Sequence, residues 1–256
     1  EMYSWIDQGG NALTLKPELT APVIRAYLQH NLGNKHPMHR MYYFDALYRR
    51  ERPQRGRQRQ FHQFGAEAIG SPNPEQDAEI IALAYNIFQS FGIKDLTVHL
   101  NSIGSAEIRP AYLERLLLSV KNITDELCKT CQKRLANNAL RIFDCKNTDC
   151  QTLLDEHAHF IFDSISDDDL QHFYKLTDIL NEMKIPFKHD KKLVRGLDYY
   201  SHTTFEITTS NLGAQDALCG GGRYNGLIEQ LGGKSTPAVG FAAGVERLIL
   251  AFNKTI

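Results

Sequence analysis

The chain has 256 residues, of which 42% are hydrophobic and 23% are charged, and its formal net charge is -1. These values predict a globular protein with one large core and room for a smaller insertion. No apolar run approaches the roughly 18 residues of a membrane span and no signal-peptide pattern opens the sequence, so a cytoplasmic protein is expected.

The first predicted element is a helix that begins after Thr20. The threonine can cap its N-terminus. An apolar stripe at helical spacing then runs along one side, formed by Val23, Ile24, Tyr27 and Leu28.

A strand, a basic loop and a returning strand follow. Residues 38–48 are aromatic and apolar, residues 59–69 are again strand-like, and the breaker segment 52–56 separates them. Because side chains alternate along a strand, Gln63 and Glu67 point to the same face, with Gly65 between them. We expect this face to be the floor of a polar pocket.

The same stretch concentrates positive charge, since twenty residues contain seven arginines and no lysine. They are Arg40, Arg49, Arg50, Arg52, Arg55, Arg57 and Arg59. A planar guanidinium binds phosphate or carboxylate through two hydrogen bonds, so the cluster predicts a site for a polyanion such as a triphosphate. A solvated charged hairpin is the alternative.

The rest of the chain alternates between strand and helix patterns. A helix is expected over 74–91, ending at Gly92, and a strand over 96–100, whereas 105–190 are helical and polar. Strands over 199–208, 217–220 and 238–241 precede a last helix. Long strands joined by hairpins predict an α+β fold, with an antiparallel sheet flanked by helices and a helical insertion. The stripe of the 74–91 helix is Ile81, Ala84, Tyr85, Phe88 and Phe91, and that of the last helix is Val245, Leu248, Ile249 and Phe252.

Four of the five cysteines lie in the predicted insertion. Cys128 and Cys131 form a C-x-x-C pair, and Cys145 and Cys150 form a looser one that could complete a tetrahedral zinc site. Four free thiols are the favoured alternative, because a cytoplasmic protein keeps its cysteines reduced. Cys219 is expected to be a small buried hydrophobe.

Four segments in order resemble histidyl-tRNA synthetases, a family of class II aminoacyl-tRNA synthetases. KPELT (16–20) is similar to the histidine-binding loop, YRRERPQRGRQRQFHQ (48–63) to motif 2, LVRGLDYY (193–200) to the histidine-specific motif, and 220–250 to motif 3. The resemblance implies a class II fold that uses ATP and Mg²⁺ to convert L-histidine to histidyl-adenylate. The histidyl group is then transferred to the 3' end of tRNA(His), and the full-length protein is expected to be a homodimer.

The resemblance also implies that the chain is a catalytic-domain fragment. The sequence does not start with methionine, motif 1 is expected upstream, and an anticodon-binding domain is expected after Ile256. The predicted division is 1–104 as the first part of the catalytic domain, 105–190 as a helical insertion that approaches the acceptor arm of the tRNA, and 191–256 as the second part.

For adenylation, two anions must be held together while charge develops on the phosphoryl oxygens. By resemblance, Arg49 binds the α-phosphate, Glu51 lies by the adenine and the metal-bound phosphates, and Arg57 reaches the γ-phosphate. Arg247 stacks on the adenine, and Arg195 lies between the histidine carboxylate and the α-phosphate. Arg49, Arg195 and Arg247 are therefore the predicted catalytic residues, and no protein nucleophile is expected.

Choosing histidine requires partners for both ring nitrogens, because a buried group left unpaired rejects the wrong side chain. Glu67 is expected to accept from one ring N–H and Tyr200 to hydrogen-bond the other nitrogen. The other predicted histidine-binding residues are Arg195, Tyr199 and three that receive the α-ammonium group, Glu18, Thr20 and Gln63. Gly196 is expected to let the backbone approach the ligand. Lys16 and Leu19 depart from the arginine and glycine usual in the family.

Two other functions remain open. One is a catalytically silent synthetase relative that senses histidine as a regulatory subunit in histidine biosynthesis, and it would not need the ATP-binding residues. The other is a nucleic-acid-binding module, for which phosphate contacts from the basic hairpin would suffice.

Overall fold

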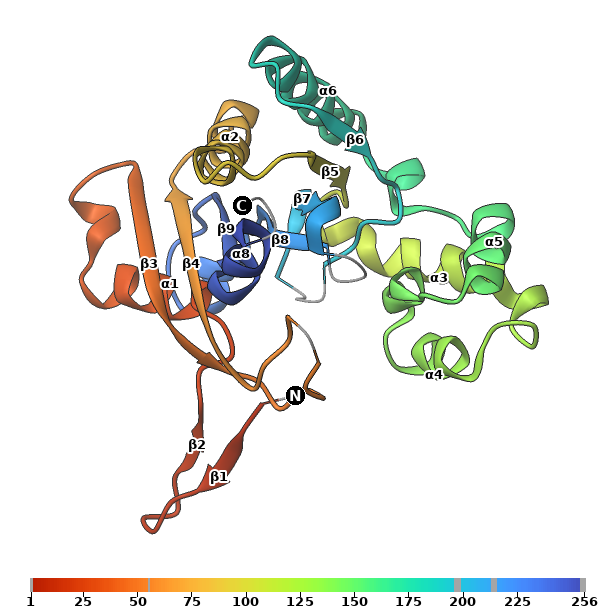
Figure 1. Ribbon diagram of the computed structural model, residues 1–256, viewed down its shortest axis with the longest axis horizontal. Coiled ribbons are helices and arrows are strands. Elements are labelled where there is room, and N and C mark those ends of the chain that lie inside the picture. Colours follow the sequence, from red (N-terminus) through yellow and green to blue (C-terminus); the bar gives the residue numbers. More distant parts are fainter. Residues whose placement is uncertain (1, 55, 196–198, 213–215, 254–256) are drawn as a thin grey trace.

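A seven-stranded sheet occupies the centre of the fold (Figure 1). In spatial order its strands are β3 (His39–Tyr48), β4 (Gln60–Ile69), β9 (Ala238–Gly244), β8 (Ala217–Arg223), β7 (Ser201–Thr209), β5 (Leu96–Ser102) and β6 (Phe187–His189). All neighbours are antiparallel except β5 and β6. This computed structural model describes residues 2–54, 56–195, 199–212 and 216–253. The α+β fold is confirmed, with one parallel edge strand that the sequence pattern did not predict.

The sheet has one apolar face and one polar face, because side chains alternate along each strand. On β9, Val239 and Phe241 belong to the central core, whereas Ala242 lines a cavity on the opposite face. β4 follows the same rule, since Phe64 packs against the core and Gln63 lines the cavity. The predicted polar face of the returning strand is therefore confirmed.

Three helices contribute to the core on the apolar face: α2 (Pro74–Ser90), α6 (Asp167–Glu182) and α8 (Val245–Phe252). The predicted stripe of α2 is buried at Ile81, Ala84 and Phe88, but Phe91 is 47% exposed. Phe91 is the C-cap residue, and the chain turns away directly after it at Gly92, whose φ is 73°. In α8, Leu248 is buried, whereas Ile249 is exposed.

Helix α1 (Thr20–Gln29) packs with the short α7 (Leu227–Gln230) through Ile24, Tyr27 and Ile228. The prediction that Thr20 caps this helix is wrong. The Glu18 carboxylate accepts from the backbone N–H of Thr20 at 2.7 Å and that of the next residue at 3.0 Å. The Thr20 hydroxyl is therefore available to donate elsewhere.

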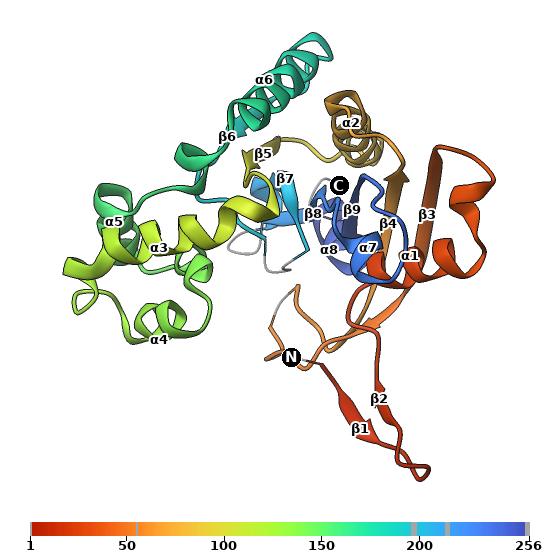
Figure 2. The same ribbon diagram turned by 180° about the vertical axis from the view of Figure 1, so that it is seen from behind.

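Residues 103–164 form a helical lobe with its own hydrophobic core (Figures 1 and 2). Its elements are η2 (Ala106–Ile108), α3 (Arg109–Val120), η3 (Lys121–Ile123), α4 (Lys129–Asn137), η4 (Ala139–Asp144), α5 (Thr148–His157) and η5 (Ile161–Ser164). The predicted insertion extended to residue 190, but α6 packs in the central core and β6 pairs with β5. This packing favours a lobe that ends before α6, and the division into domains stays a prediction.

A two-stranded hairpin, β1 (Ser4–Ile6) and β2 (Ala12–Thr14), projects from the body of the molecule in both views (Figures 1 and 2). The remaining elements are the short 3₁₀ helices η1 (Leu32–Asn34) and η6 (Ser210–Leu212). Within the described part of the chain, no helix combines the length and apolar character that crossing a membrane requires.

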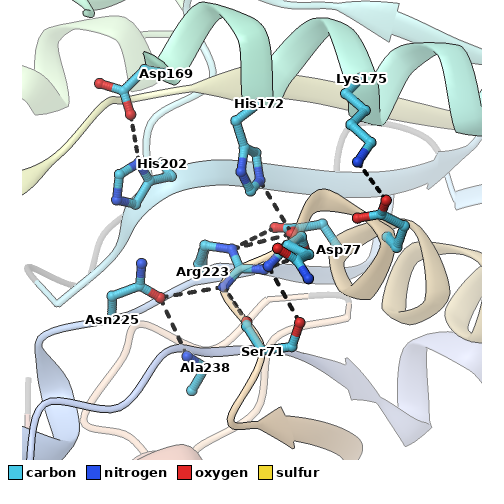
Figure 3. A network of polar contacts seen from close by, with 11 residues as sticks. Ser71, Asp77, Asp169, His172, Lys175, His202, Arg223, Asn225 and Ala238 are labelled. Atoms are coloured by element: carbon cyan, nitrogen blue, oxygen red, sulfur yellow. Dashed lines mark hydrogen bonds and ion pairs between the residues drawn. The ribbon is translucent and has the colours of Figure 1, made fainter.

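A buried ion pair ties α2 and α6 to the sheet (Figure 3). Arg223, at the end of β8, places Nη2 2.5 Å from Oδ2 of Asp77 on α2, and both side chains are fully buried. His172 on α6 lies 3.2 Å from the same carboxylate. Burial raises the pKa of Asp77, but the hydrogen bond from His172 and the charge of Arg223 outweigh it and lower the pKa. The Asp77 carboxylate therefore joins α2 and α6 to the end of β8.

Replacing Asp77 by alanine should destabilise the fold strongly. The Arg223 guanidinium would stay buried without its carboxylate, which costs roughly 3–5 kcal/mol. Urea denaturation measures the loss. As a control on the same helix, Glu75→Ala removes an exposed pair with Lys175 and should cost less than about 1 kcal/mol. Equal losses in the two variants would contradict the structural role of the buried pair.

Candidate active site

A cavity of about 190 Å³ opens on the polar face of the sheet. It is lined by every residue predicted to bind ATP or histidine except Glu67. The predicted residues that line the cavity are Glu18, Thr20, Arg49, Glu51, Arg57, Gln63, Arg195, Tyr199, Tyr200 and Arg247. The predicted approach at Gly196 falls outside the described residues, as does Arg55 of the basic loop.

Strand pairing brings these segments together. Arg49 follows the last residue of β3, and β3 pairs with β4 along its whole length. In the next pair, Gln63 of β4 lies opposite Gly244 of β9, and the helix that carries Arg247 begins directly after this glycine. Residues nearly 200 positions apart in the sequence therefore meet at one end of adjacent strands.

Arg49 is held at the cavity by an aromatic ring, a backbone carbonyl and a nearby carboxylate. Its guanidinium lies 5.0 Å from the centre of the Phe61 ring, and its Nε donates to the Pro17 carbonyl at 2.8 Å. The Glu51 carboxylate is 4.0 Å away. Burial lowers the pKa of Arg49, with Glu51 acting in the opposite direction, so an incoming anion would stabilise the charged form.

Arg247 is held in a comparable way. Nε donates to the carbonyl of Gly56 at 2.9 Å, and Nη1 donates to the carbonyl of Ala217 at 3.0 Å. Burial also lowers the pKa of Arg247. Both arginines thus donate to backbone carbonyls, which fix the direction of their guanidinium groups.

The basic loop is closed at its base and turned at its tip. The Arg49 N–H donates to the Arg59 carbonyl at 2.9 Å, and backbone hydrogen bonds between Gln54 and Arg57 are 2.9 and 3.0 Å long. Arg57 Nε lies 3.1 Å from Glu51 Oε2, and both residues line the cavity. This loop therefore presents a cation and a carboxylate to the same space.

Arg195 reaches the cavity from the side of the helical lobe. Its Nη1 donates to the Glu206 carboxylate on β7 at 2.8 Å, whereas its buried Nε has no hydrogen-bond partner among the described residues. A Cβ at Gly220 would overlap the guanidinium, so this glycine makes room for the arginine. The contacts of Glu206 and Gly220 with Arg195 were not predicted from the sequence.

Glu67 lies below the cavity and is 1% exposed. Its Oε1 accepts from the hydroxyls of Thr20 at 2.8 Å and Tyr43 at 3.2 Å, and its Oε2 accepts from Tyr224 at 2.5 Å. Burial raises the pKa of Glu67 to about 7. Its direct contact with a ligand stays a prediction.

The two tyrosines that bond Glu67 were missed by sequence reasoning. Tyr43 of β3 stands opposite Gly65 of β4, and its hydroxyl occupies the space that a Cβ at this glycine would fill. A large polar aromatic residue opposite a glycine on the next strand could have indicated that its side chain crosses over that glycine. No comparable local signal marked Tyr224, which reaches Glu67 from beyond the end of β8.

The tyrosine pair forms the wall next to the helical lobe. The rings of Tyr199 and Tyr200 lie 4.8 Å apart, and burial raises the pKa of both phenols, so they remain neutral hydrogen-bonding groups. The Tyr200 carbonyl accepts from Arg109 of the lobe at 2.6 Å.

Lys16 and Leu19, the two residues that depart from the family pattern, have different surroundings. Lys16 pairs with Asp45 and does not line the cavity. Leu19 lines the cavity and is buried in a small apolar cluster with Tyr43 and Leu47. Leu19 therefore forms part of the cavity wall, whereas Lys16 does not.

Glu246 also belongs to the cavity, whereas the cysteines of the helical lobe do not. Glu246, which was not predicted, lines the cavity and accepts from the His62 N–H at 3.0 Å and from its Nδ1 at 2.9 Å. Four cysteines of the predicted insertion converge in the helical lobe, and none of them lines the cavity. They are Cys128, Cys131, Cys145 and Cys150.

The buried Glu67 should make stability depend on pH. Its folded-state pKa is about 7, above the ordinary 4.5, so the folded chain keeps a proton that the unfolded chain loses first. The free energy of unfolding should therefore decrease as the pH rises from about 5 to about 7, by on the order of 3 kcal/mol at most. Above about pH 7, Glu67 should cause no further decrease. Urea unfolding of wild type and Glu67→Gln across this range tests it. Parallel stability curves would show that Glu67 does not titrate in this way.

Comparison with known proteins agrees with this geometry. The family model described as "Histidyl-tRNA synthetase" matches residues 1–248. The histidine--tRNA ligase of Moorella thermoacetica is 48% identical over 253 residues, which are 99% of this chain and 60% of that protein. The chain thus spans about 60% of the length of the curated relatives it matches.

Solved structures resemble the whole chain. The apo histidyl-tRNA synthetase of S. aureus superposes with a TM-score of 0.76 at 38% identity, over 99% of this chain and 61% of that one. A protein from Bacillus halodurans described as an ATP phosphoribosyltransferase regulatory subunit/histidyl-tRNA synthetase has a TM-score of 0.69 at 23% identity, over 98% of this chain and 68% of that one, and shares the fold. From the match to residues 1–248 and the close relatives, the chain belongs to the histidyl-tRNA synthetase family.

Proposed function

We propose that this protein uses ATP to activate L-histidine to histidyl-adenylate and transfers the histidyl group to the 3' end of tRNA(His). The observation that carries the proposal is the convergence of Arg49, Arg195 and Arg247 on one cavity, next to the polar residues Thr20 and Gln63. Four arginines and four glutamates line the cavity with these neutral groups, so it offers partners both for phosphate and carboxylate groups and for an ammonium group, as in a ligand that joins a phosphate to an amino acid. The names of the close relatives support the same reaction.

In the proposed first step, the histidine carboxylate attacks the α-phosphorus of ATP, an oxygen–phosphorus bond forms, and pyrophosphate leaves. Arg195 would contact both reacting anions and Arg49 the α-phosphate, so that the charge developing on its oxygens is stabilised by preorganised donors. Arg247 and Arg57 would hold the outer phosphates and the adenine. The α-ammonium group would be received by Glu18, Thr20 and Gln63, and Gln63 Oε1 has no hydrogen-bond partner among the described residues.

Mg²⁺ is the expected companion of the phosphates. Glu51 fits this role, because its carboxylate lines the cavity and oxygen ligands suit this hard cation. The ion would neutralise phosphate charge and orient the leaving pyrophosphate. The chain's own part is to fix Glu51, which the neighbouring Arg57 does at 3.1 Å.

Selection of histidine would rest on the wall made by Tyr199 and Tyr200 and on the floor above Glu67. The Tyr200 phenol, kept neutral by burial, would hydrogen-bond one ring nitrogen. Glu67 would meet the other ring N–H, either directly after a hydroxyl moves or through Thr20, which it holds at 2.8 Å. A side chain without two ring nitrogens would leave these groups unpaired.

A histidine-sensing regulatory subunit is the second candidate, and the residues of the cavity argue against it. A sensor needs the histidine-binding residues alone, yet Arg49, Glu51, Arg57 and Arg247 line the same space. The nucleic-acid module is also disfavoured. Arg49 and Arg247 are turned into a cavity and held by carbonyls, whereas backbone phosphates of a nucleic acid are met by exposed cations.

We also propose that the full-length protein is a cytoplasmic homodimer. Support for self-association comes from the edge strand β3, where Tyr42 is 89% and Phe44 is 64% exposed on one face. Exposed aromatic residues on an edge strand favour an interface. The helical lobe, joined to Tyr200 through Arg109, is the proposed contact for the acceptor arm of the tRNA.

Histidine-dependent exchange of labelled pyrophosphate into ATP tests the reaction. Arg195→Ala and Arg247→Ala should each lower the exchange rate, with a loss of about 100-fold or more for Arg195, because a donor to developing charge is removed. Arg40→Ala is the matched control, since Arg40 belongs to the same basic stretch but pairs with Glu79 outside the cavity. It should retain the wild-type rate.

The outcomes separate the candidates. Histidine binding without any exchange would favour the sensor over the synthetase. Exchange that is equally fast with Arg195→Ala would show that the guanidinium does not act on the reacting anions, whatever the overall reaction is.

Gly220→Ala should weaken the site without removing a functional group. The added methyl would displace the Arg195 guanidinium, so the rate of exchange should fall by about 10-fold or more, as expected for a misplaced catalytic group. Gly226→Ala is the control, because a Cβ there meets only Gln230 Nε2 at 3.8 Å and its φ is -90°. If both variants retain full activity, the space beside Gly220 does not constrain Arg195.

A further inference from the structure

The sulfur atoms of four cysteines in the helical lobe lie in one compact cluster. Their Sγ atoms all lie within 4.8 Å of one another, and those of Cys128 and Cys145 are 3.8 Å apart. A tetrahedral zinc ion with four Zn–S bonds of about 2.3 Å places its sulfurs about 3.8 Å apart. Three of the residues are buried and Cys128 is half-buried. We propose that Cys128, Cys131, Cys145 and Cys150 bind one structural zinc ion.

The local fold presents each pair of cysteines from the start of a helix. Cys128 is the N-cap residue of α4, which places Cys131 in its first turn. In the second pair, Cys145 follows η4, and the Asn147 side chain caps α5 by accepting from the Cys150 N–H at 3.0 Å. Each pair therefore spans a tight turn into a helix N-terminus, where the helix dipole favours a negatively charged thiolate.

One hydrogen bond in the cluster fits a thiolate better than a packed thiol. The backbone N–H of Cys128 donates to Sγ of Cys150 at 3.2 Å, and a thiolate is a better acceptor than a neutral thiol. The charge of the surrounding sequence is complementary. Between Cys128 and Cys150 there are two acidic residues, Asp144 and Asp149, and five basic ones, Lys129, Lys133, Arg134, Arg141 and Lys146. This excess of three positive charges offsets the double negative charge of a zinc ion with four thiolates.

Zinc is the metal that this donor set favours. Four sulfur ligands in tetrahedral order suit zinc or iron, and a closed site with four protein ligands is typical of structural zinc. In a lobe of short helices with a small core, the ion would hold α4 and α5 together, because metal binding adds to the free energy of folding.

The zinc site would also brace the segment that carries Arg195. Gln151, the residue after Cys150, donates through Nε2 to the Cys145 carbonyl at 2.7 Å. Its Oε1 accepts from Lys192 Nζ at 2.7 Å, and Lys192 also pairs with Asp155 of α5 at 2.6 Å. Lys192 stands three positions before Arg195. A chain of contacts thus runs from the cysteines to the wall of the cavity.

Metal analysis of the purified protein tests the proposal. Inductively coupled plasma mass spectrometry should find one zinc per chain. Cys131→Ser and Cys145→Ser should lose it, and Cys219→Ala should retain it, because this fifth cysteine is buried elsewhere, on β8. Zinc content unchanged in either serine variant, or zinc absent from the wild-type protein, overturns the proposal.

Because a serine variant can fail to fold, the wild-type protein supplies a second test. Exchange of zinc for cobalt should give the intense thiolate-to-cobalt absorption and the visible bands of tetrahedral coordination. Chelation should lower the melting temperature, and added zinc should restore it. Iron in place of zinc, a disulfide among the four cysteines found by mass spectrometry, or a melting temperature that does not respond to chelation contradicts the assignment.

Discussion

The site depends on guanidinium groups that the protein buries and directs into one cavity. Arg49 and Arg247 donate to backbone carbonyls, and burial lowers the pKa of both guanidinium groups. In a cavity of low dielectric, a buried positive charge is stabilised further when an anion arrives. Arg195, which is paired with Glu206, adds a third cation whose direction is fixed. Geometry and charge together therefore favour a ligand that carries more than one anionic group.

The two faces of the sheet allow this arrangement. The apolar face is covered by α2, α6 and α8, with the Asp77–Arg223 pair joining α2 to the sheet. The polar face can then carry a buried carboxylate, Glu67, beneath the cavity floor. Close approach is possible because Gly65 and Gly220 leave space for Tyr43 and Arg195. Rigid support on one face thus permits polar groups, which add little stability, on the other.

Much of the site could be predicted because its signals are local. The arginine cluster, the alternation around Gln63 and the helix that begins after Gly244 are each contained in a few residues. The place of Glu67 could not be predicted in the same way, since it depends on hydroxyls from Thr20, Tyr43 and Tyr224 in three separate segments.

The extent of the helical lobe shows the same limit. The polar helical pattern of α6 looks like that of the lobe, but Phe173, Leu176 and Leu180 pack into the central core. The parallel strand β6 has only three residues and gives no periodic signal. Pairings between distant segments decide both features, and a pattern within one segment does not contain that information.

A crystal structure with histidine and a non-hydrolysable ATP analogue tests the central claim most directly. The histidine carboxylate and the α-phosphate should lie within hydrogen-bonding distance of Arg195, with Arg49 on the phosphate. Ligands bound outside the cavity, or an Arg195 that stays on Glu206 and contacts neither anion, would contradict it.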